Sequence, residues 1–376
     1  MNLINIKNFF EKLNKFRFSC ICGILLLTLI ALFSGQNTIP PIDRDEARFA
    51  QASRQMIQTN DFVNIKFQDE LRAKKPVGIY WIQALSANVF GETKISSFRF
   101  PSIIFSLISL IFIGLLTRLI FPFYQSLIVV LFFGSSFVFI GEAHLAKTDA
   151  TLLALICVQQ YYLLKLILKK GSLAQIKFWY PLVIWIAFAF GILVKGPLSI
   201  VILSLTTISF CFVKKDFSLL KSLNPLLGII VSSIIILPWI IAINEATQGL
   251  FIEKAFNDDF FSKLKSGQEG HGAWPGMHLI MLSITLWPLA MIIPGSIIFF
   301  LNNKSNLVVQ FLICWIIPFW FLIEIVPTKL IHYSLPILPA ITILSLGSIF
   351  HSQSQIQNIK NKIFHKLILT LSIIFG

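Results

Sequence analysis

The sequence contains little charge for its length. Only 13% of its 376 residues are charged, whereas 56% are hydrophobic, and its mean hydropathy is +0.80. Soluble globular domains carry about 25% charged residues, so this composition argues against a soluble protein. Apolar runs near 20 residues recur from end to end, which is typical of a polytopic membrane protein. Backbone groups in hydrocarbon must bond internally, so we expect an all-α fold.

Cysteine is also scarce. The five cysteines lie within or at the ends of apolar runs, as expected for small buried side chains: Cys20, Cys22, Cys157, Cys211 and Cys314. Neither a disulfide framework nor a cysteine metal site is indicated. No alternation of apolar and polar residues with regular turns predicts a β-barrel.

Acidic residues are outnumbered, with 17 against 31 basic residues and a net charge of +14. An excess of this size is found in nucleic-acid-binding proteins. Here, however, the lysines lie in short loops between apolar runs, where they report orientation in a membrane. We therefore predict no nucleic-acid partner and a membrane protein instead.

The apolar runs predict ten spans, with an eleventh that begins near 366 and reaches the last residue. We expect them near 18–34, 100–120, 123–142, 149–168, 179–194, 197–213, 224–243, 277–301, 307–325 and 335–350. The basic N-terminus precedes the first span without a convincing cleavage site, which favours an uncleaved first helix. The chain is thus predicted to be one transmembrane domain over 1–376, a fragment or truncated relative that stops within a helix.

Segment 76–91 is short and only moderately apolar. If it lies in the membrane interface and the N-terminus is cytoplasmic, most loop lysines fall on the cytoplasmic side. If it spanned the membrane, every later loop would invert and this agreement would be lost. We therefore predict an interfacial helix, which makes 35–99 a long external loop with nine lysines and arginines. These cations indicate an anionic lipid partner.

This loop gathers three acids and three arginines between residues 43 and 54. Residues 45–58 predict an amphipathic helix lying on the membrane, with Phe49, Ala50, Ser53, Met56 and Ile57 on one stripe. Asp43 and Glu46 have the spacing of a capping box at its start. Asp45, between them, has no such duty.

The stretch from Asp45 to Ala50, "DEARFA", is followed by "KKPVGIYW" at 74–81. Together they resemble the first periplasmic loop of polyprenyl-phosphate-sugar glycosyltransferases with the GT-C fold. That family includes aminoarabinose transferases of lipid A and protein O-mannosyltransferases. "AHLAKTDA", "LVKGP" and "PTKLIHYSLPILPA" follow in the order that these enzymes carry similar segments.

The resemblance implies a GT-C-like bundle of about 10–11 transmembrane helices, with interfacial helices in the first external loop. It implies an enzyme that moves one sugar from a polyprenyl (undecaprenyl) phosphate donor to a lipid (lipid A-like) or protein acceptor, with inversion. The location implied is the bacterial inner membrane, with the active site on the periplasmic face.

In this reading Asp45 is the catalytic base, or orients the substrate if the acceptor is itself a phosphate. Lys75 is the first choice for the donor phosphate, with Arg48 and Lys329 next. The remaining substrate-binding residues implied are Glu46, Asp149, His271 and Tyr333. Three of these residues have a structural alternative. Lys75 could extend to the lipid head groups, Asp149 or Thr148 could be a helix N-cap, and His271 could be a solvated loop residue.

Two positions depart from the family pattern. Lys74 stands where the family has an acid, and Val77 replaces a proline. The family's acid has been linked to a metal or substrate contact, so we predict no metal ligand and assign no cofactor, with a divalent cation left open. The external loop 244–275 is expected to act as a lid or acceptor-side element.

Other functions stay open. Another GT-C enzyme, an oligosaccharyltransferase or O-antigen ligase, would share the external acid. A non-catalytic relative would use the external charges only as interfacial anchors. A lipid or sugar transporter is disfavoured, because it predicts charges within spans or internally repeated broken helices.

Overall fold

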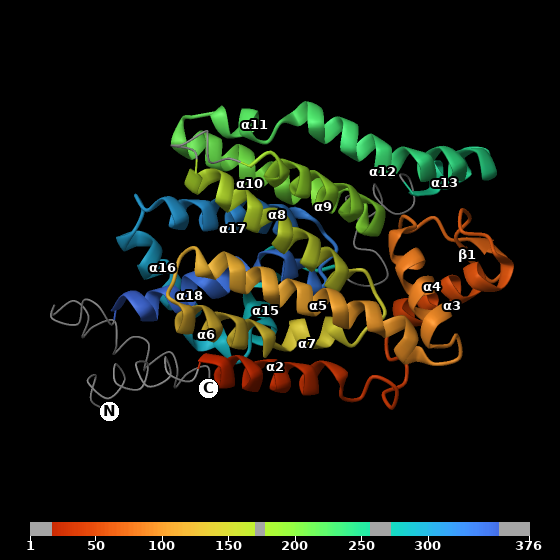
Figure 1. Cartoon of the computed structure of the whole chain (residues 1–376), viewed down its shortest axis with the longest axis horizontal. Coiled ribbons are helices and arrows are strands. Elements are labelled where there is room, and N and C mark those ends of the chain that lie inside the picture. The colour runs from red at the N-terminus through yellow and green to blue at the C-terminus, as the bar shows by residue number, and fades with distance from the viewer. Residues whose placement is uncertain (1–16, 170–176, 256–271, 353–376) are drawn as a thin grey trace.

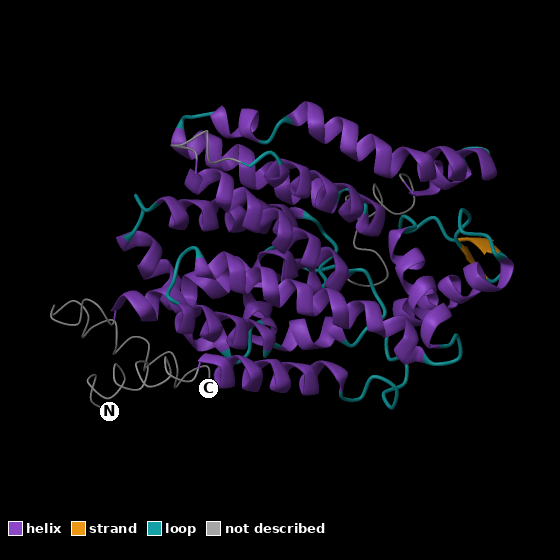
Figure 2. Ribbon diagram, viewed as in Figure 1, coloured by secondary structure: helices purple, strands orange, loops and turns teal. Residues whose placement is uncertain are grey.

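The computed structural model describes residues 17–169, 177–255 and 272–352. Helices account for nearly all of the regular structure in these ranges (Figure 2). Each of the ten predicted spans coincides with a helix or a broken helix, whereas the predicted eleventh lies outside the described residues. Within these described ranges, five helices are long and apolar enough to cross a membrane, and counting one bent pair as a span gives six. The all-α membrane fold is confirmed.

The helix α8 (Asp149–Lys169) is the central element of the bundle. It packs against α5 (Ile95–Arg118) and α9 (Trp179–Lys195). Its most apolar window is 78% buried, although its sequence is less apolar than those of other spans. Burial by protein lets this helix carry Gln159 and Gln160 inside the bundle, where Gln159 donates to the Ser199 hydroxyl.

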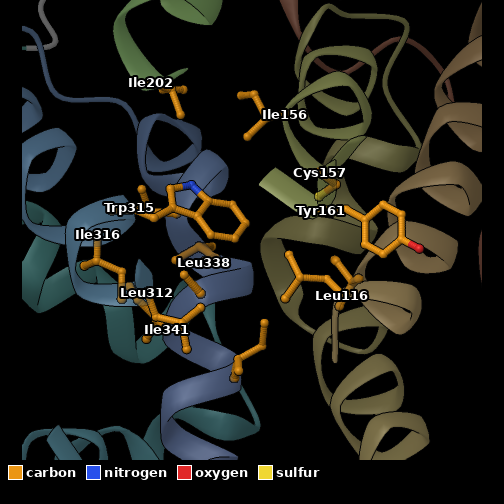
Figure 3. Close-up of a cluster of buried hydrophobic side chains, with 14 of the residues drawn as sticks. Leu116, Ile156, Cys157, Tyr161, Ile202, Leu312, Trp315, Ile316, Leu338 and Ile341 are labelled. Carbon is orange, nitrogen blue, oxygen red and sulfur yellow. The ribbon is translucent and has the colours of Figure 1, made fainter. Parts of the chain in front are cut away.

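Apolar side chains from several helices fill the space between α8 and the C-terminal half of the bundle. Trp315 of α17 (Leu307–Ile325) is 1% exposed and lies in this cluster with Ile156, Ile202 and Leu338 (Figure 3). The remaining members of this layer come from α10 (Leu198–Lys214) and α18 (Leu338–Ser352). The core therefore joins helices far apart in the sequence.

The helix α12 (Pro225–Ala246) lies along an outer edge of the bundle (Figure 1). Only 17% of its apolar window is buried. Its outer side chains include Leu226, Ile230 and Ile234, all exposed. A helix with this composition faces lipid along most of its length. It is followed by the short α13 (Leu250–Lys254).

Two predicted spans are broken. The segment 123–142 forms α6 (Phe123–Gly134) and α7 (Phe137–Ala143), with a bend of 67° between them. The segment 277–301 forms α15 (Met277–Thr285), a 3-10 turn η3 (Leu289–Ile292) and α16 (Ile293–Asn302). Continuous helices were predicted in both places. Proline at 288 interrupts the second, because it cannot donate the helical hydrogen bond.

The first helix α2 (Arg17–Phe33) packs on α7 along the outside of the bundle. The connection between α10 and α12 contains the short helix α11 (Ser218–Ser222). Before α18, the chain forms a 3-10 segment η4 (Ile331–Ile337) that contacts α7, α8 and α17. This segment carries His332 and Tyr333 to the end of the bundle where α8 begins.

The loop 35–99 is folded, and it gathers at one end of the bundle (Figure 1). It contains α3 (Arg44–Thr59), a hairpin of β1 (Lys66–Phe67) and β2 (Glu70–Leu71), and α4 (Gly78–Phe90). The predicted helices at 45–58 and 76–91 are therefore present. The two strands are antiparallel and pair Lys66 with Leu71.

The apolar stripe of α3 was predicted to face the membrane, and this is wrong. Phe49, Ala52 and Met56 are buried against Tyr80 of α4 and Trp239 of α12. The stripe has the right period, but amphipathicity does not tell whether lipid or protein covers it. Protein contact makes α3 a fixed platform at the end of the bundle.

Candidate active site

Asp45 lies in the first turn of α3 between two arginines. Its Oδ1 is 3.7 Å from Arg48 on the next turn and 3.7 Å from Arg72, which follows the hairpin. Its side chain is 49% exposed, whereas that of Arg72 is 7% exposed. Both arginine contacts are longer than a hydrogen bond. Asp45 is thus held among cations and still reaches solvent.

Arg72 was not identified from the sequence as a site residue. Its Nε donates to the Tyr80 hydroxyl at 3.1 Å, and its guanidinium lies 5.1 Å from the centre of the Phe49 ring. These contacts fix a buried cation beside Asp45. Tyr80 belongs to the expected K-P-x-x-x-Y-W segment, and this hydrogen bond gives it a structural role.

Glu46 is the fully buried neighbour of Asp45. Both of its oxygens accept from Arg99 of α5, at 2.6 and 3.0 Å, and Oε1 also accepts from the Ala146 N–H at 3.0 Å. Its predicted capping-box bond is therefore wrong, because the carboxylate turns into the bundle. Its predicted contact with substrate stays untested, and here its carboxylate holds α3 against α5.

Asp43 is the N-cap of α3 as expected, although its side chain accepts from the Asp45 N–H and not from the Glu46 N–H of a capping box. Its Oδ1 accepts from the Asp45 N–H at 2.7 Å, and its Oδ2 accepts from Lys147 Nζ at 2.9 Å. Burial raises the pKa of Asp43, but Lys147 and the Asp45 N–H lower it by more, so the pKa lies below its usual value. Asp43 is therefore an ionised N-cap.

A charged network lies behind Asp43. Lys147 is 3.6 Å from Glu142, and Glu142 is 3.5 Å from His332. His332 is also 3.9 Å from Asp149, which forms a short ion pair with Lys195. Lys147 comes from the connection between α7 and α8, and the other groups come from α7, α8, α9 and η4. The predicted site residue Asp149 is thus paired with Lys195 of the quoted segment "LVKGP", the last residue of α9.

Lys75 follows the hairpin in the segment that leads to α4. Its Nζ donates to the Lys74 carbonyl at 2.9 Å, a contact on the exposed side of the loop. Lys75 is half-buried and belongs to the same external loop as Asp45. The predicted role of Lys75 in binding phosphate stays untested.

Lys329 is 5% exposed and lies in a second cluster. Its Nζ donates to the carbonyls of Ile323 and Glu324, both at 2.7 Å, and is 3.6 Å from the Glu324 carboxylate. Burial lowers the pKa of Lys329 more than Glu324 raises it. These contacts give Lys329 a structural duty that the sequence did not predict.

Tyr333 is half-buried on η4. Its ring stacks on the His278 ring at 6.5 Å and meets the His332 ring edge at 5.3 Å. It therefore connects the Lys329 cluster to the network around Glu142. His271, the last predicted site residue, lies outside the described residues, as does half of the predicted lid 244–275.

Glu142, Lys147 and His332 escaped the sequence-based prediction as site residues. Lys147 stands in the quoted motif "AHLAKTDA" and His332 in "PTKLIHYSLPILPA". Their positions next to the predicted site residues Asp149 and Tyr333 are the sequence feature that could have identified them. Among the residues that the structure describes, no group of three or more His, Cys, Asp and Glu side chains could hold a metal ion.

Comparisons with known proteins agree with the fold described above. The family model described as dolichyl-phosphate-mannose-protein mannosyltransferase matches residues 74–241. The crystal structure of ArnT from Cupriavidus metallidurans bound to undecaprenyl phosphate matches with a TM-score of 0.81 at 19% identity. It covers 95% of this chain and 63% of that one. The chain therefore has the GT-C membrane fold.

Similar sequences among known proteins include glycosyltransferases named for an undecaprenyl-phosphate-linked sugar. An undecaprenyl phosphate-alpha-4-amino-4-deoxy-L-arabinose arabinosyl transferase of Proteus mirabilis is 25% identical over 333 residues, covering 84% of this chain and 58% of that protein. A second, of Pectobacterium carotovorum, is 23% identical over 304 residues, covering 80% and 53%. The chain thus spans little more than half the length of these relatives. The expected resemblance to polyprenyl-phosphate-sugar glycosyltransferases is confirmed.

Another solved structure is more distant. The archaeal oligosaccharyltransferase AglB from Archaeoglobus fulgidus, in complex with an inhibitory peptide and a dolichol-phosphate, matches with a TM-score of 0.62 at 12% identity. It covers 95% of this chain and 54% of that one. The architecture is shared with this enzyme, but the agreement is poorer than with ArnT.

Proposed function

We propose that this chain is a membrane glycosyltransferase that moves one sugar from undecaprenyl phosphate to an acceptor at the periplasmic surface of the bacterial inner membrane. The observation that carries the proposal is Asp45, a half-exposed acid fixed beside Arg48 and Arg72 at the end of a GT-C bundle. The named activity of the Proteus mirabilis relative supports the donor class. The charge distribution of the loops supports the orientation.

In this mechanism Asp45 accepts the proton of an acceptor hydroxyl as the oxygen attacks the anomeric carbon. The bond from that carbon to the phosphate oxygen breaks on the opposite face, so the configuration inverts. Undecaprenyl phosphate departs with the bonding electrons and gains one negative charge. An acid within reach of the hydroxyl and cations near the leaving group are the two requirements.

The cations around Asp45 meet the second requirement. Tyr80 and Phe49 fix the guanidinium of Arg72, so this group needs little rearrangement to bind a phosphate. Arg48 and Lys75 are proposed to complete the phosphate site, and Arg offers two parallel donors to phosphate oxygens. Lys329 and Tyr333 are proposed to shape the far side of the site through the His278 and His332 contacts.

The acceptor is proposed to be a lipid of the lipid A type, with a protein as the alternative. The single-sugar reading is favoured over an oligosaccharyltransferase because the ArnT fold agrees better than AglB, at TM-scores of 0.81 and 0.62. A non-catalytic relative would bind the donor and release no undecaprenyl phosphate, which the following assay detects.

The test is sugar transfer in lipid vesicles that contain lipid A and undecaprenyl phosphate carrying labelled 4-amino-4-deoxy-L-arabinose. We expect Asp45→Asn to reduce transfer by about a hundredfold or more, because an amide cannot accept the proton. Asp69→Asn is the matched control, since Asp69 is an exposed acid of the same loop. Equal transfer by Asp45→Asn and the parent would remove Asp45 from the mechanism.

A further inference from the structure

The short connection between α7 and α8 holds the first turn of α3 at two points. Lys147 Nζ binds the carboxylate of Asp43, and the N–H of the adjacent Ala146 binds that of Glu46. These two acids flank Asp45 in the sequence. The connection 144–148 therefore holds the backbone on both sides of the proposed base.

Asp43 links the Lys147 ammonium to the backbone of Asp45. Oδ2 of Asp43 accepts from Lys147 while Oδ1 accepts from the Asp45 N–H, so two hydrogen bonds join the ammonium to the backbone of Asp45. In contrast, the side chain of Asp45 is 3.7 Å from each neighbouring arginine. The hydrogen bonds of Asp43 are shorter than these arginine contacts, so they restrain the backbone of Asp45 more strongly than its own side chain does. On the other side of Asp45, the bonds of Glu46 to Arg99 and Ala146 restrain the same turn.

A second acid, Glu142, lies close to the Lys147 ammonium. Lys147 is 7% exposed and lies 3.6 Å from Glu142, which continues through His332 to Asp149 and Lys195. Burial lowers the pKa of Lys147, but the charges of Glu142 and Asp149 and the bond to Asp43 raise it by more. The charged ammonium thus connects α3, through Asp43, to the bundle helices α7 and α8.

We propose that Lys147 is a positioning residue, which fixes the N-terminus of α3 on the bundle and thereby sets the place of Asp45 relative to the bound donor. The catalytic part of this inference rests on the proposed function. Lys147 itself does not need to touch the substrate. Its effect passes through Asp43, whose two oxygens serve the lysine and the helix at once.

Two variants separate charge from packing. Lys147→Met keeps a long side chain and removes the ammonium, whereas Lys147→Arg keeps a cation that can bind the same carboxylates. The matched control is Lys221→Met, because Lys221 is an exposed lysine of α11 outside the site. All are compared as equal amounts of folded protein.

The first measurement is amide hydrogen exchange, which needs no activity. We expect Lys147→Met to speed exchange in the first turn of α3 by about tenfold, because that turn loses the anchor at Asp43 and keeps only the one at Glu46. Exchange in α5 should match the parent, and Lys221→Met should leave both unchanged. Unaltered exchange in α3, or equal acceleration throughout the chain, would overturn the positioning role.

The second measurement is sugar transfer. We expect kcat of Lys147→Met to fall by about tenfold to a hundredfold, since a misplacement of about 1 Å can have that effect. KM for the donor should change by less than about threefold, and Lys147→Arg should recover kcat to within about threefold of the parent. An unchanged kcat in Lys147→Met would overturn the link to catalysis.

The two measurements also separate this inference from the proposed function. If the parent transfers no sugar, the proposed function fails, while exchange still decides whether Lys147 holds α3. If the parent is active and exchange in α3 is unaltered in Lys147→Met, only the positioning inference fails.

Discussion

The buried ion pair between Glu46 and Arg99 gives the sharpest stability prediction. Arg99 is 1% exposed and donates to both oxygens of Glu46. It also donates to the carbonyls of Gln36, Ile39 and Pro40, at 2.8, 2.8 and 3.2 Å. One side chain thus joins α5 to α3 and to the chain that leaves α2.

Arg99→Met removes all five of these hydrogen bonds. It leaves the Glu46 carboxylate buried with only the Ala146 N–H as a donor, and it deprives three carbonyls of a partner. Removing one partner of a buried ion pair costs about 3–5 kcal/mol, because the remaining charge stays out of water. We expect a loss of unfolding free energy in that range.

The assay is reversible unfolding by SDS in mixed micelles, followed by tryptophan fluorescence. Arg118→Met is the matched control, because Arg118 lies at the other end of α5 with an exposed hydrogen bond to the Phe121 carbonyl. It should cost less than about 1 kcal/mol. The double variant Arg99→Met with Glu46→Gln should recover part of the loss, since no unpaired charge remains. A loss below about 1 kcal/mol in Arg99→Met would refute the reasoning.

Two further predictions concern a titration and a helix contact. The pKa of Asp43 is lower in the folded chain, so its contribution to stability is present above the usual aspartate pKa of about 4. That contribution is lost as the pH falls through the pKa that Asp43 has in the folded chain. Asp43→Asn, which keeps the N-cap acceptor, should flatten this part of an acid-unfolding curve, and an identical curve would exclude the ion pair as its source. Gly78→Ala should destabilise by about 1–3 kcal/mol, because a Cβ would lie 2.8 Å from the Leu193 backbone. In thermal unfolding, Gly141→Ala should be nearly neutral, since its Cβ meets nothing within 4 Å; equal effects would refute the packing argument.

The sequence by itself determined the membrane class and the positions of the helices. Long apolar runs leave few alternatives in hydrocarbon, where a continuous helix satisfies its own backbone. It also located the helix that carries Asp45, because the N-cap Asp43 and the period of the apolar stripe are local signals. These features depend on neighbours within a few residues.

Local signals failed where a partner lies far along the chain. Glu46 has the spacing of a capping residue, but Arg99, 53 positions away, binds it inside the bundle. The stripe of α3 has the period of a membrane-facing helix, but α4 and α12 cover it. For Lys329, the role in binding phosphate stays a prediction, and the structure adds contacts with two backbone carbonyls and Glu324 that the sequence did not indicate.

Only the tertiary structure decided which charges meet. Arg72 reaches Asp45 because the hairpin turns it back over Phe49, and Lys147 reaches Asp43 because α7 and α8 meet at the end of the bundle. A charge in the sequence has no fixed partner until packing brings an opposite charge within a few ångströms. Coulomb energy falls with distance and with access to water, so burial and separation set the role of each charged residue.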